Sequence, residues 1–353
     1  MKKEFKDNGD KIIKTFEDFG IKMKIKEILH GPVETFYVLK LITPTRMKEL
    51  DDFYRDLTHA LGTKDIEIEA PILNKPYIGV RVKNEKREFI FWKDIIKNKK
   101  FQKTQKNLVL PIGRTEGEDI FLDFFENPHL VISGISSSGK SNFLLSLVAS
   151  LMIKFNHKEL KLILADPKRV EFSIFQDSPY LMKPIIQTTK KALSTAEELV
   201  IEMDKRYELL EDKGVRNIIE YNNKVKEKMP YIFFIIDEIS DFMLDNKNNA
   251  SKKIEEAIVS LLQKSRAIGI NVFISTSRPC KKTLPGLLLA NSFNRIAFRL
   301  ITKSDSESIL DCSGAEKLLC DGDSLFSDID HYLKPRRIQT PLISDDEIKN
   351  IIT

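Results

Sequence analysis

From about residue 129 onward, short apolar runs alternate with longer stretches whose apolar residues recur at helical spacing. The runs are HLVIS, KLILA, YIFFIID, NVFIST and RIAFRL, at residues 129–133, 161–165, 231–237, 271–276 and 295–300. Between the second and third runs, Leu193, Leu199, Met203 and Leu210 mark a helix over about residues 191–213. Apolar strands separated by amphipathic helices indicate a parallel α/β sheet.

Residues 21–110 have a different pattern, with strand-like runs around one helical stretch, which predicts a small α+β domain. We therefore expect a lysine-rich N-terminal segment (1–20), this small domain (21–110), the main α/β domain (111–345) and a short C-terminal tail (346–353). Within residues 81–106, basic side chains are interleaved with Phe89, Phe91 and Trp92, as on some nucleic-acid-binding surfaces. The alternation in EFIFW favours instead a half-buried strand with its aromatic side chains turned into the core.

The first apolar run leads into a glycine-bounded loop that fits G-x-x-x-x-G-K-[ST] from Gly134 to Ser141. In such a loop the backbone N–H groups and the start of the next helix face phosphates, the lysine reaches the β- and γ-phosphates, and the last hydroxyl can ligate Mg²⁺. The apolar strand before it and the apolar helix after it argue against a chance match in a serine-rich turn. The residues expected to hold ATP are Gly134, Ser136, Ser137, Ser138, Gly139, Lys140, Ser141 and Asn142.

The run YIFFIIDE ends in two adjacent carboxylates, Asp237 and Glu238. At the carboxyl end of a parallel strand, Asp237 is expected to hold Mg²⁺ together with Ser141, and Glu238 to polarise an attacking water. These two tasks separate ATP hydrolysis from nucleotide binding alone. Because the apolar run KLILA intervenes in the sequence, we expect an extra strand between the two motifs, which favours a RecA-like ATPase over a nucleotide kinase.

The fourth run ends in the polar tip Ser275, Thr276, Ser277 and Arg278, where Ser277 is a candidate for contacting the γ-phosphate. Arg266 stands just before this run, in a place from which an arginine finger could reach a neighbouring subunit's nucleotide. On spacing alone, a surface salt bridge is the better interpretation of Arg266.

Composition restricts the class of protein less than these motifs do. The 57 basic and 52 acidic residues give a formal net charge of +5, which favours a polyanionic partner only weakly. The three cysteines form no C-x-x-C pair and suggest neither a disulfide framework nor a zinc site, so a cytoplasmic setting is expected. The apolar runs are far shorter than the roughly 18 residues of a membrane helix, so no direct membrane insertion is expected.

In this order along the chain, the motifs resemble those of the FtsK/SpoIIIE-type DNA translocases. The resemblance extends through HGPVETFYVLKL, PHLVISGISSSGKS, LILADPKRVEFSIF, YIFFIIDEISDFM, QKSRAIGINVFISTSRP and NRIAFRLITKSDSESILDC. It implies a hexameric ring of RecA-like domains that hydrolyses ATP with Mg²⁺ and moves double-stranded DNA through its centre. It also implies that Arg266 reaches the neighbour's nucleotide, in place of the salt-bridge interpretation, and that Arg278 and Lys303 contact the DNA backbone.

Two residues depart from the family's pattern. Ser277 stands where a glutamine is usual, which predicts a shorter or water-mediated sensor. Glu307 stands where a further basic DNA contact is expected, and a carboxylate there predicts a weaker or different grip on DNA. Since no C-terminal winged-helix domain and no N-terminal membrane helices are seen, we expect the motor to serve a plasmid, phage or other mobile element.

Two alternatives stay open at this point. One is a coupling ATPase for conjugative DNA transfer, with a membrane or DNA-processing protein as its partner. The other is an ATP-switched DNA-binding or assembly factor in replication or partition that does not pump DNA.

Overall fold

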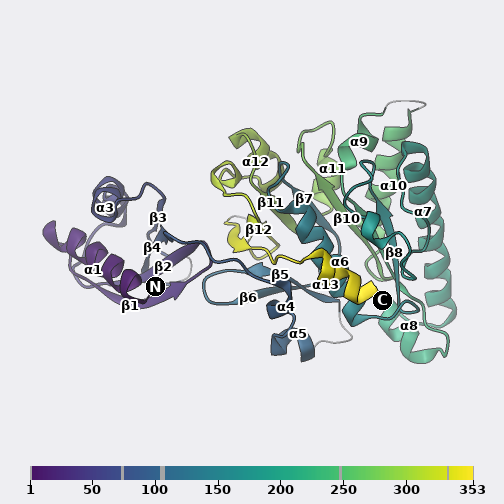
Figure 1. Cartoon of the computed structure of the whole chain (residues 1–353), viewed down its shortest axis with the longest axis horizontal. Helices are drawn as coiled ribbons and strands as arrows, with labels where there is room; N and C mark the ends of the chain where they lie inside the picture. The colour runs from purple at the N-terminus through teal and green to yellow at the C-terminus, as the bar shows by residue number, and fades with distance from the viewer. Residues whose placement is uncertain (1, 73–74, 104–107, 246–248, 332–333, 353) are drawn as a thin grey trace. The chain divides into compact units, whose positions relative to one another are not determined.

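In the computed structural model the chain divides into two compact units, and most of their helices and strands are labelled in Figure 1. The structure describes all residues except 1, 73–74, 104–107, 246–248, 332–333 and 353. Unit 1 comprises Met1–Phe89 and Arg114–Asp119, and unit 2 comprises Ile90–Gly113 and Ile120–Thr353. The lysine-rich start is therefore part of unit 1, and residues 90–110, expected in the small domain, belong to unit 2.

Unit 1 is an antiparallel four-stranded sheet, in the order β1-β2-β4-β3, packed with helices. Buried Ile12 and Phe16 of α1 share a core with Leu57 of α3 and with Tyr37 and Val80 of the sheet. This is the α+β unit that the sequence predicts. Its elements are α1 (Lys2–Asp18), β1 (Met23–His30), β2 (Glu34–Leu41), α2 (Met47–Asp51), α3 (Tyr54–Leu61), β3 (Ile66–Glu69) and β4 (Ile78–Lys83).

Unit 2 is built on a nine-stranded sheet in the order β6-β5-β13-β12-β11-β7-β10-β9-β8. The neighbours from β11 to β8 are parallel, whereas β12 pairs antiparallel with both β11 and β13. The five predicted apolar runs are the five parallel strands. The strands are β5 (Val109–Arg114), β6 (Asp119–Asp123), β7 (Leu130–Ser133), β8 (Leu160–Ala165), β9 (Tyr231–Ile236), β10 (Ile270–Thr276), β11 (Arg295–Phe298), β12 (Asp323–Ser327) and β13 (Arg336–Gln339).

A strand does lie between the two motif strands β7 and β9, but it is β10 and not the KLILA strand. The KLILA strand, β8, lies beyond β9 at the edge of the sheet. Helical crossovers allow parallel strands to pair in an order different from their order in sequence, so apolar patterning identifies a strand but not its neighbours. One strand thus separates the two motif strands, as expected for a RecA-like ATPase. The strand that separates them is β10, whereas the sequence order suggests the KLILA strand.

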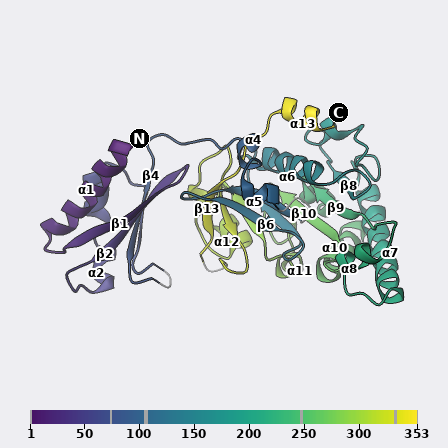
Figure 2. The ribbon, with the colours of Figure 1, turned by 90° about the horizontal axis from the view of Figure 1, so that it is seen from below.

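Helices cover both faces of this sheet, with α6 on one face and α7 and α10 on the other (Figure 2). Along β9, Ile232, Phe234 and Ile236 share a core with α7 and α10, and Phe233 and Ile235 share a second core with α6. The helices are α4 (Trp92–Ile95), α5 (Lys99–Lys103), α6 (Lys140–Lys154), α7 (Thr189–Asp212), α8 (Ile218–Lys224), α9 (Ile239–Met243), α10 (Ala250–Lys264), α11 (Gly286–Ala290), α12 (Lys303–Leu310) and α13 (Asp345–Ile352), with short 3₁₀ turns at Ser173–Phe175 and Ala315–Lys317.

The segment EFIFW is not the strand that its alternation predicts. Ile90 and Trp92 are buried, but Phe89 and Phe91 are 46% and 49% exposed, so these two rings do not turn into the core. Trp92 begins α4, and its indole N–H donates a hydrogen bond to Ser150 Oγ at 2.9 Å. The buried side chains of Ile90 and Trp92 therefore anchor this segment, and the two phenylalanines face outward.

Within the described residues, no helix is long and apolar enough to cross a lipid bilayer.

Candidate nucleotide-binding site

The glycine-bounded loop connects β7 directly to α6, as its sequence predicts. Gly139 has φ +105°, and a Cβ there would lie 2.3 Å from the backbone nitrogen of Gly322. That nitrogen donates a hydrogen bond to the carbonyl oxygen of Ser138 at 2.8 Å. Only glycine fits this close approach, so the turn before β12 braces the loop against the start of α6.

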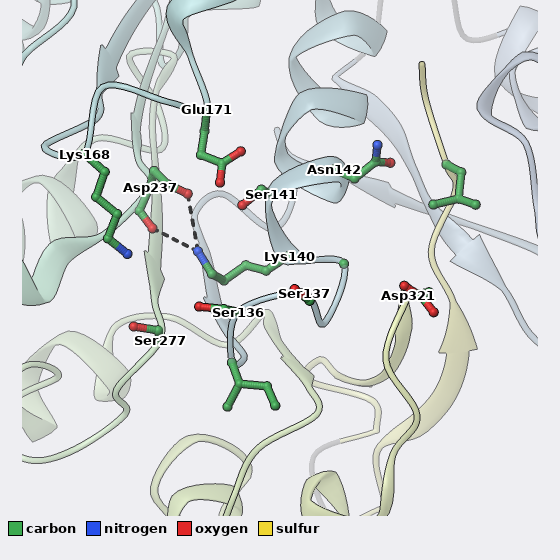
Figure 3. Close-up of a pocket in the computed structure, with 13 residues that line it drawn as sticks. Ser136, Ser137, Lys140, Ser141, Asn142, Lys168, Glu171, Asp237, Ser277 and Asp321 are labelled. Carbon is green, nitrogen blue, oxygen red and sulfur yellow. Dashed lines mark hydrogen bonds and ion pairs between the residues drawn. The ribbon is translucent and has the colours of Figure 1, made fainter. Parts of the chain in front are cut away.

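A cavity of about 470 Å³ opens beside this loop (Figure 3). It lies at the carboxyl ends of the parallel strands, where α/β folds bind their ligands, and its size is within the range of small-molecule sites. The residues that line it are Ile135, Ser136, Ser137, Gly139, Lys140, Ser141, Asn142, Lys168, Glu171, Asp237, Ser277, Asp321 and Leu342.

Lys140 and Asp237 form a buried pair at one side of the cavity. Lys140 Nζ lies 3.3 Å from Asp237 Oδ1 and 3.2 Å from the carbonyl oxygen of the same residue. Burial raises the pKa of Asp237, and the nearby ammonium of Lys140 opposes that rise. A lysine at this point of a phosphate loop is positioned to exchange its carboxylate partner for a phosphate.

Glu238 is only 1% exposed, and its carboxylate accepts hydrogen bonds on both oxygens. Ser240 Oγ donates to Oε1 at 2.6 Å, and Thr276 Oγ1 donates to the same oxygen at 2.8 Å. Ser277 donates to Oε2 from its hydroxyl at 2.6 Å and to both oxygens from its N–H at 3.1 Å. Burial alone would raise the pKa of Glu238, but these donors outweigh it and lower the pKa to about 2.

Strand register explains why these groups meet. Ile236 of β9 pairs with Ile274 of β10 on one side and with Ala165 of β8 on the other. The residues just after the three strands therefore gather at one edge of the sheet, and Thr276 and Ser277 come opposite Glu238.

The predicted nucleotide-binding residues divide into those that line the cavity and those that do not. Ser136, Ser137, Gly139, Lys140, Ser141, Asn142, Asp237 and Ser277 line it, whereas Gly134, Ser138 and Glu238 are not part of its wall. Ser138 Oγ is buried with no hydrogen-bond partner among the described residues. The amide of Asn142 exchanges two hydrogen bonds with the backbone of Ile343, so it also fastens α6 to the segment after β13.

Lys168, Glu171 and Asp321 also line the cavity, although the sequence motifs do not predict them. Lys168 and Glu171 follow β8 just as Asp237 follows β9, so the end of the KLILA run was a signal for them. Asp321 lies in the turn before β12, far from any recognised motif, and only the folded chain brings it to the loop.

The three predicted basic residues lie outside this cavity. Arg266 is 56% exposed on its side chain, and its Nη2 lies 2.7 Å from Glu126 Oε2. Arg278 is exposed in the segment after β10. Lys303 begins α12, and its Nζ lies 3.4 Å from Glu307 Oε1 one helical turn on, so the predicted DNA contact is paired with the very residue that departs from the family's pattern.

The donor set suits Mg²⁺. Ser141 and Asp237 supply a hydroxyl and a carboxylate oxygen to the same cavity. Among the described residues, no group of three or more His, Cys, Asp and Glu side chains forms a metal cage. Mg²⁺ in phosphate-transfer sites is usually held by one or two protein oxygens together with substrate phosphates, which agrees with this pair.

Two family models match the chain: the FtsK/SpoIIIE family over residues 92–281 and the FtsK alpha domain over residues 1–84. This chain belongs to the FtsK/SpoIIIE family. It is 35% identical to DNA translocase SpoIIIE of Bacillus subtilis (strain 168), over 99% of the chain and 45% of that protein. It is 38% identical to DNA translocase FtsK of Lactococcus lactis subsp. lactis, over 96% of the chain and 45% of that protein. This FtsK/SpoIIIE family member thus spans about half the length of the curated relatives it matches.

Solved structures confirm the P-loop ATPase fold for this member of the FtsK/SpoIIIE family. The pCW3 conjugation coupling protein TcpA, solved with ATPγS, matches with a TM-score of 0.69 at 23% identity, over 98% of each chain. The cytoplasmic domain of the Thermomonospora curvata type VII secretion ATPase EccC matches with a TM-score of 0.61 at 22% identity, over 70% of this chain and 31% of that one.

Proposed function

We propose that this chain hydrolyses ATP to translocate double-stranded DNA as a subunit of a ring-shaped motor. The observation that carries the proposal is that Lys140, at the start of α6 in the phosphate loop, is paired with Asp237 at the carboxyl end of β9, where Glu238 follows directly. A water-activating carboxylate next to a metal-holding one is the arrangement that hydrolysis needs. Because the chain belongs to the FtsK/SpoIIIE family, whose curated members are DNA translocases, DNA is the substrate that we expect it to move.

Each residue of the site then has a task. The backbone N–H groups of the loop and the ammonium of Lys140 bind the phosphates, and Ser141 and Asp237 hold the ion. Mg²⁺, when bound, neutralises charge on the phosphate oxygens. Glu238 orients and polarises the attacking water, and its carboxylate must give up part of its present hydrogen-bond shell to accept a bond from that water.

The DNA contact is assigned to Arg278 and Lys303, which are both exposed and basic. Contacts of this kind to phosphates carry no base information, which suits a motor that moves over any sequence. Arg266 is assigned to the neighbouring subunit's nucleotide. Its present partner is an exposed carboxylate, and such surface pairs are worth at most about 1 kcal/mol, so little opposes its transfer to a phosphate.

The assay that tests the proposal is displacement of a third strand from a duplex that carries a triplex-forming site. We expect displacement that requires ATP and is lost in Glu238→Gln, while this variant still binds nucleotide. Intact duplex binding and ATP hydrolysis without displacement would contradict the pumping step.

In that case the two other functions would move ahead. A coupling ATPase for conjugative transfer predicts co-purification with a membrane or DNA-processing protein. An assembly factor predicts slow hydrolysis and persistent duplex binding without movement. Service to a plasmid, phage or other mobile element, and the number of six subunits in the ring, stay predictions.

A further inference from the structure

Lys168 reaches the cavity from a turn whose shape is fixed by hydrogen bonds to Asp166. β8 ends at Ala165, and the buried carboxylate of Asp166 then accepts hydrogen bonds from the backbone N–H groups of Arg169 (2.8 Å) and Phe172 (3.1 Å). Arg169 has φ +61°, which turns the chain back sharply. The result is a short bend, closed on Asp166, that holds Lys168 over the end of β9.

At that point Lys168 contacts the catalytic carboxylate. Its Nζ lies 3.2 Å from Glu238 Oε2, and its side chain both lines the cavity and is 48% exposed. Figure 3 shows Lys168, Asp237 and Ser277 on the same side of Lys140, and Asn142 and Asp321 on the other. The end of the cavity with Asp237 and Ser277 thus also has two lysines, one of which contacts Glu238, and the terminal phosphate belongs at this end.

Ser277 at the tip of β10 already has a different task. Its hydroxyl and its N–H both donate to Glu238, so both donors of this residue hold the catalytic carboxylate. A donor for the γ-phosphate is therefore sought on another element that lines the cavity.

We propose that Lys168 binds the γ-phosphate of ATP in its own subunit and, as a positioning residue, links the presence of that phosphate to Glu238. The inference rests on the proposed function. An ammonium has three N–H donors, so Lys168 can bond a phosphate oxygen and Glu238 together, or leave Glu238 when the phosphate binds. Either exchange alters the hydrogen-bond shell of Glu238 only when a triphosphate is present. With ADP, Lys168 keeps its contact with Glu238.

The discriminating experiment compares binding of ADP and of a non-hydrolysable ATP analogue to the full chain, without DNA. In Lys168→Ala, we expect the Kd of the analogue to rise by roughly tenfold or more, the scale of one charge-assisted hydrogen bond, and the Kd of ADP to change less than about twofold. Lys168→Arg keeps the charge and should recover much of the preference. Lys183→Ala is the matched control, because Lys183 is also paired with a glutamate, Glu198, but lies outside the cavity.

Three results would overturn the inference. Equal weakening of ADP and analogue would make Lys168 a general support of the site, and unchanged preference would limit it to neutralising Glu238. A wild-type chain with no preference for the analogue would also exclude a γ-phosphate contact, while the strand-displacement assay would still decide the proposed function. Thermal unfolding of each variant identifies a folding defect, and in that case Lys168→Arg decides.

Discussion

At the scale of single residues, the site is held together by charges and donors that are already satisfied within the protein. Lys140 is paired with Asp237, and Glu238 is bonded to three hydroxyls, a backbone N–H and Lys168. Burying these groups unpaired would cost on the order of several kcal/mol each, so their mutual contacts stabilise this arrangement of the site. When a nucleotide binds, its phosphates must therefore replace some of these side-chain contacts.

Glu238 should make the stability of the fold depend on pH in the acid range. Because its pKa falls from the ordinary 4.5 to about 2 on folding, the ionised carboxylate stabilises the native state at neutral pH. This contribution is complete above about pH 4.5 and is lost as the pH falls towards 2. Urea unfolding of wild type and Glu238→Gln at several pH values is expected to show a difference in unfolding free energy that shrinks over this range. A difference that stays constant would mean that hydrogen bonding in the native state does not depend on the charge.

At the scale of elements, one helix places a positive and a negative residue on the surface assigned to DNA. The start of α12 is fixed by a capping box, in which Thr302 Oγ1 accepts from the Asp305 N–H and the Asp305 carboxylate accepts from the Thr302 N–H. Lys303 and Glu307 then lie one turn apart and are 3.4 Å from each other. Glu307 forms an ion pair with Lys303, and its negative charge repels phosphate. The helix therefore presents less positive charge to DNA than it would with a basic residue at position 307.

Glu307→Gln should strengthen binding to duplex DNA. We expect a roughly two- to fivefold gain in affinity, the size of a surface charge effect, and a steeper dependence of the affinity on salt concentration. Glu256→Gln is the matched control, because Lys252 and Glu256 form the same i, i+4 pair on α10. A gain of the same size in both variants would indicate only the change in net charge, and no gain in either would remove α12 from the DNA contact.

At the scale of the whole molecule, no arginine is among the described residues that line the cavity of one chain. Its cationic lining residues, among those described, are Lys140 and Lys168. Arg266 lies outside the cavity, on the surface, two residues after α10 ends at Lys264. A ring would supply this arginine from the neighbouring subunit, which would make hydrolysis a property of the assembly.

Mixing two inactive variants tests this arrangement directly. Arg266→Ala should reduce the rate of ATP hydrolysis by roughly a hundredfold or more. Arginine fingers in other nucleotide hydrolases contribute about 10³- to 10⁵-fold to kcat. Lys140→Ala keeps Arg266 but loses its own phosphate contact. If subunits share sites, the mixture regains activity that neither variant shows alone. Glu126→Gln breaks the present ion pair but keeps Arg266, so it serves as the active control. A mixture without recovery would place Arg266 outside the neighbour's site.

Local sequence was sufficient to predict the phosphate loop, the acidic end of β9, and the five apolar runs that form the parallel strands. These features are set by contiguous residues, whose spacing and periodicity are legible without a fold. Tertiary structure decided which strands are neighbours, and so placed β10, not β8, between the motifs. It also brought Lys168 and Asp321 to the cavity and Thr276 to Glu238, and it left Phe89 and Phe91 exposed. Such contacts join segments far apart in the chain, and only the pairing register and the packing of the two cores fix them.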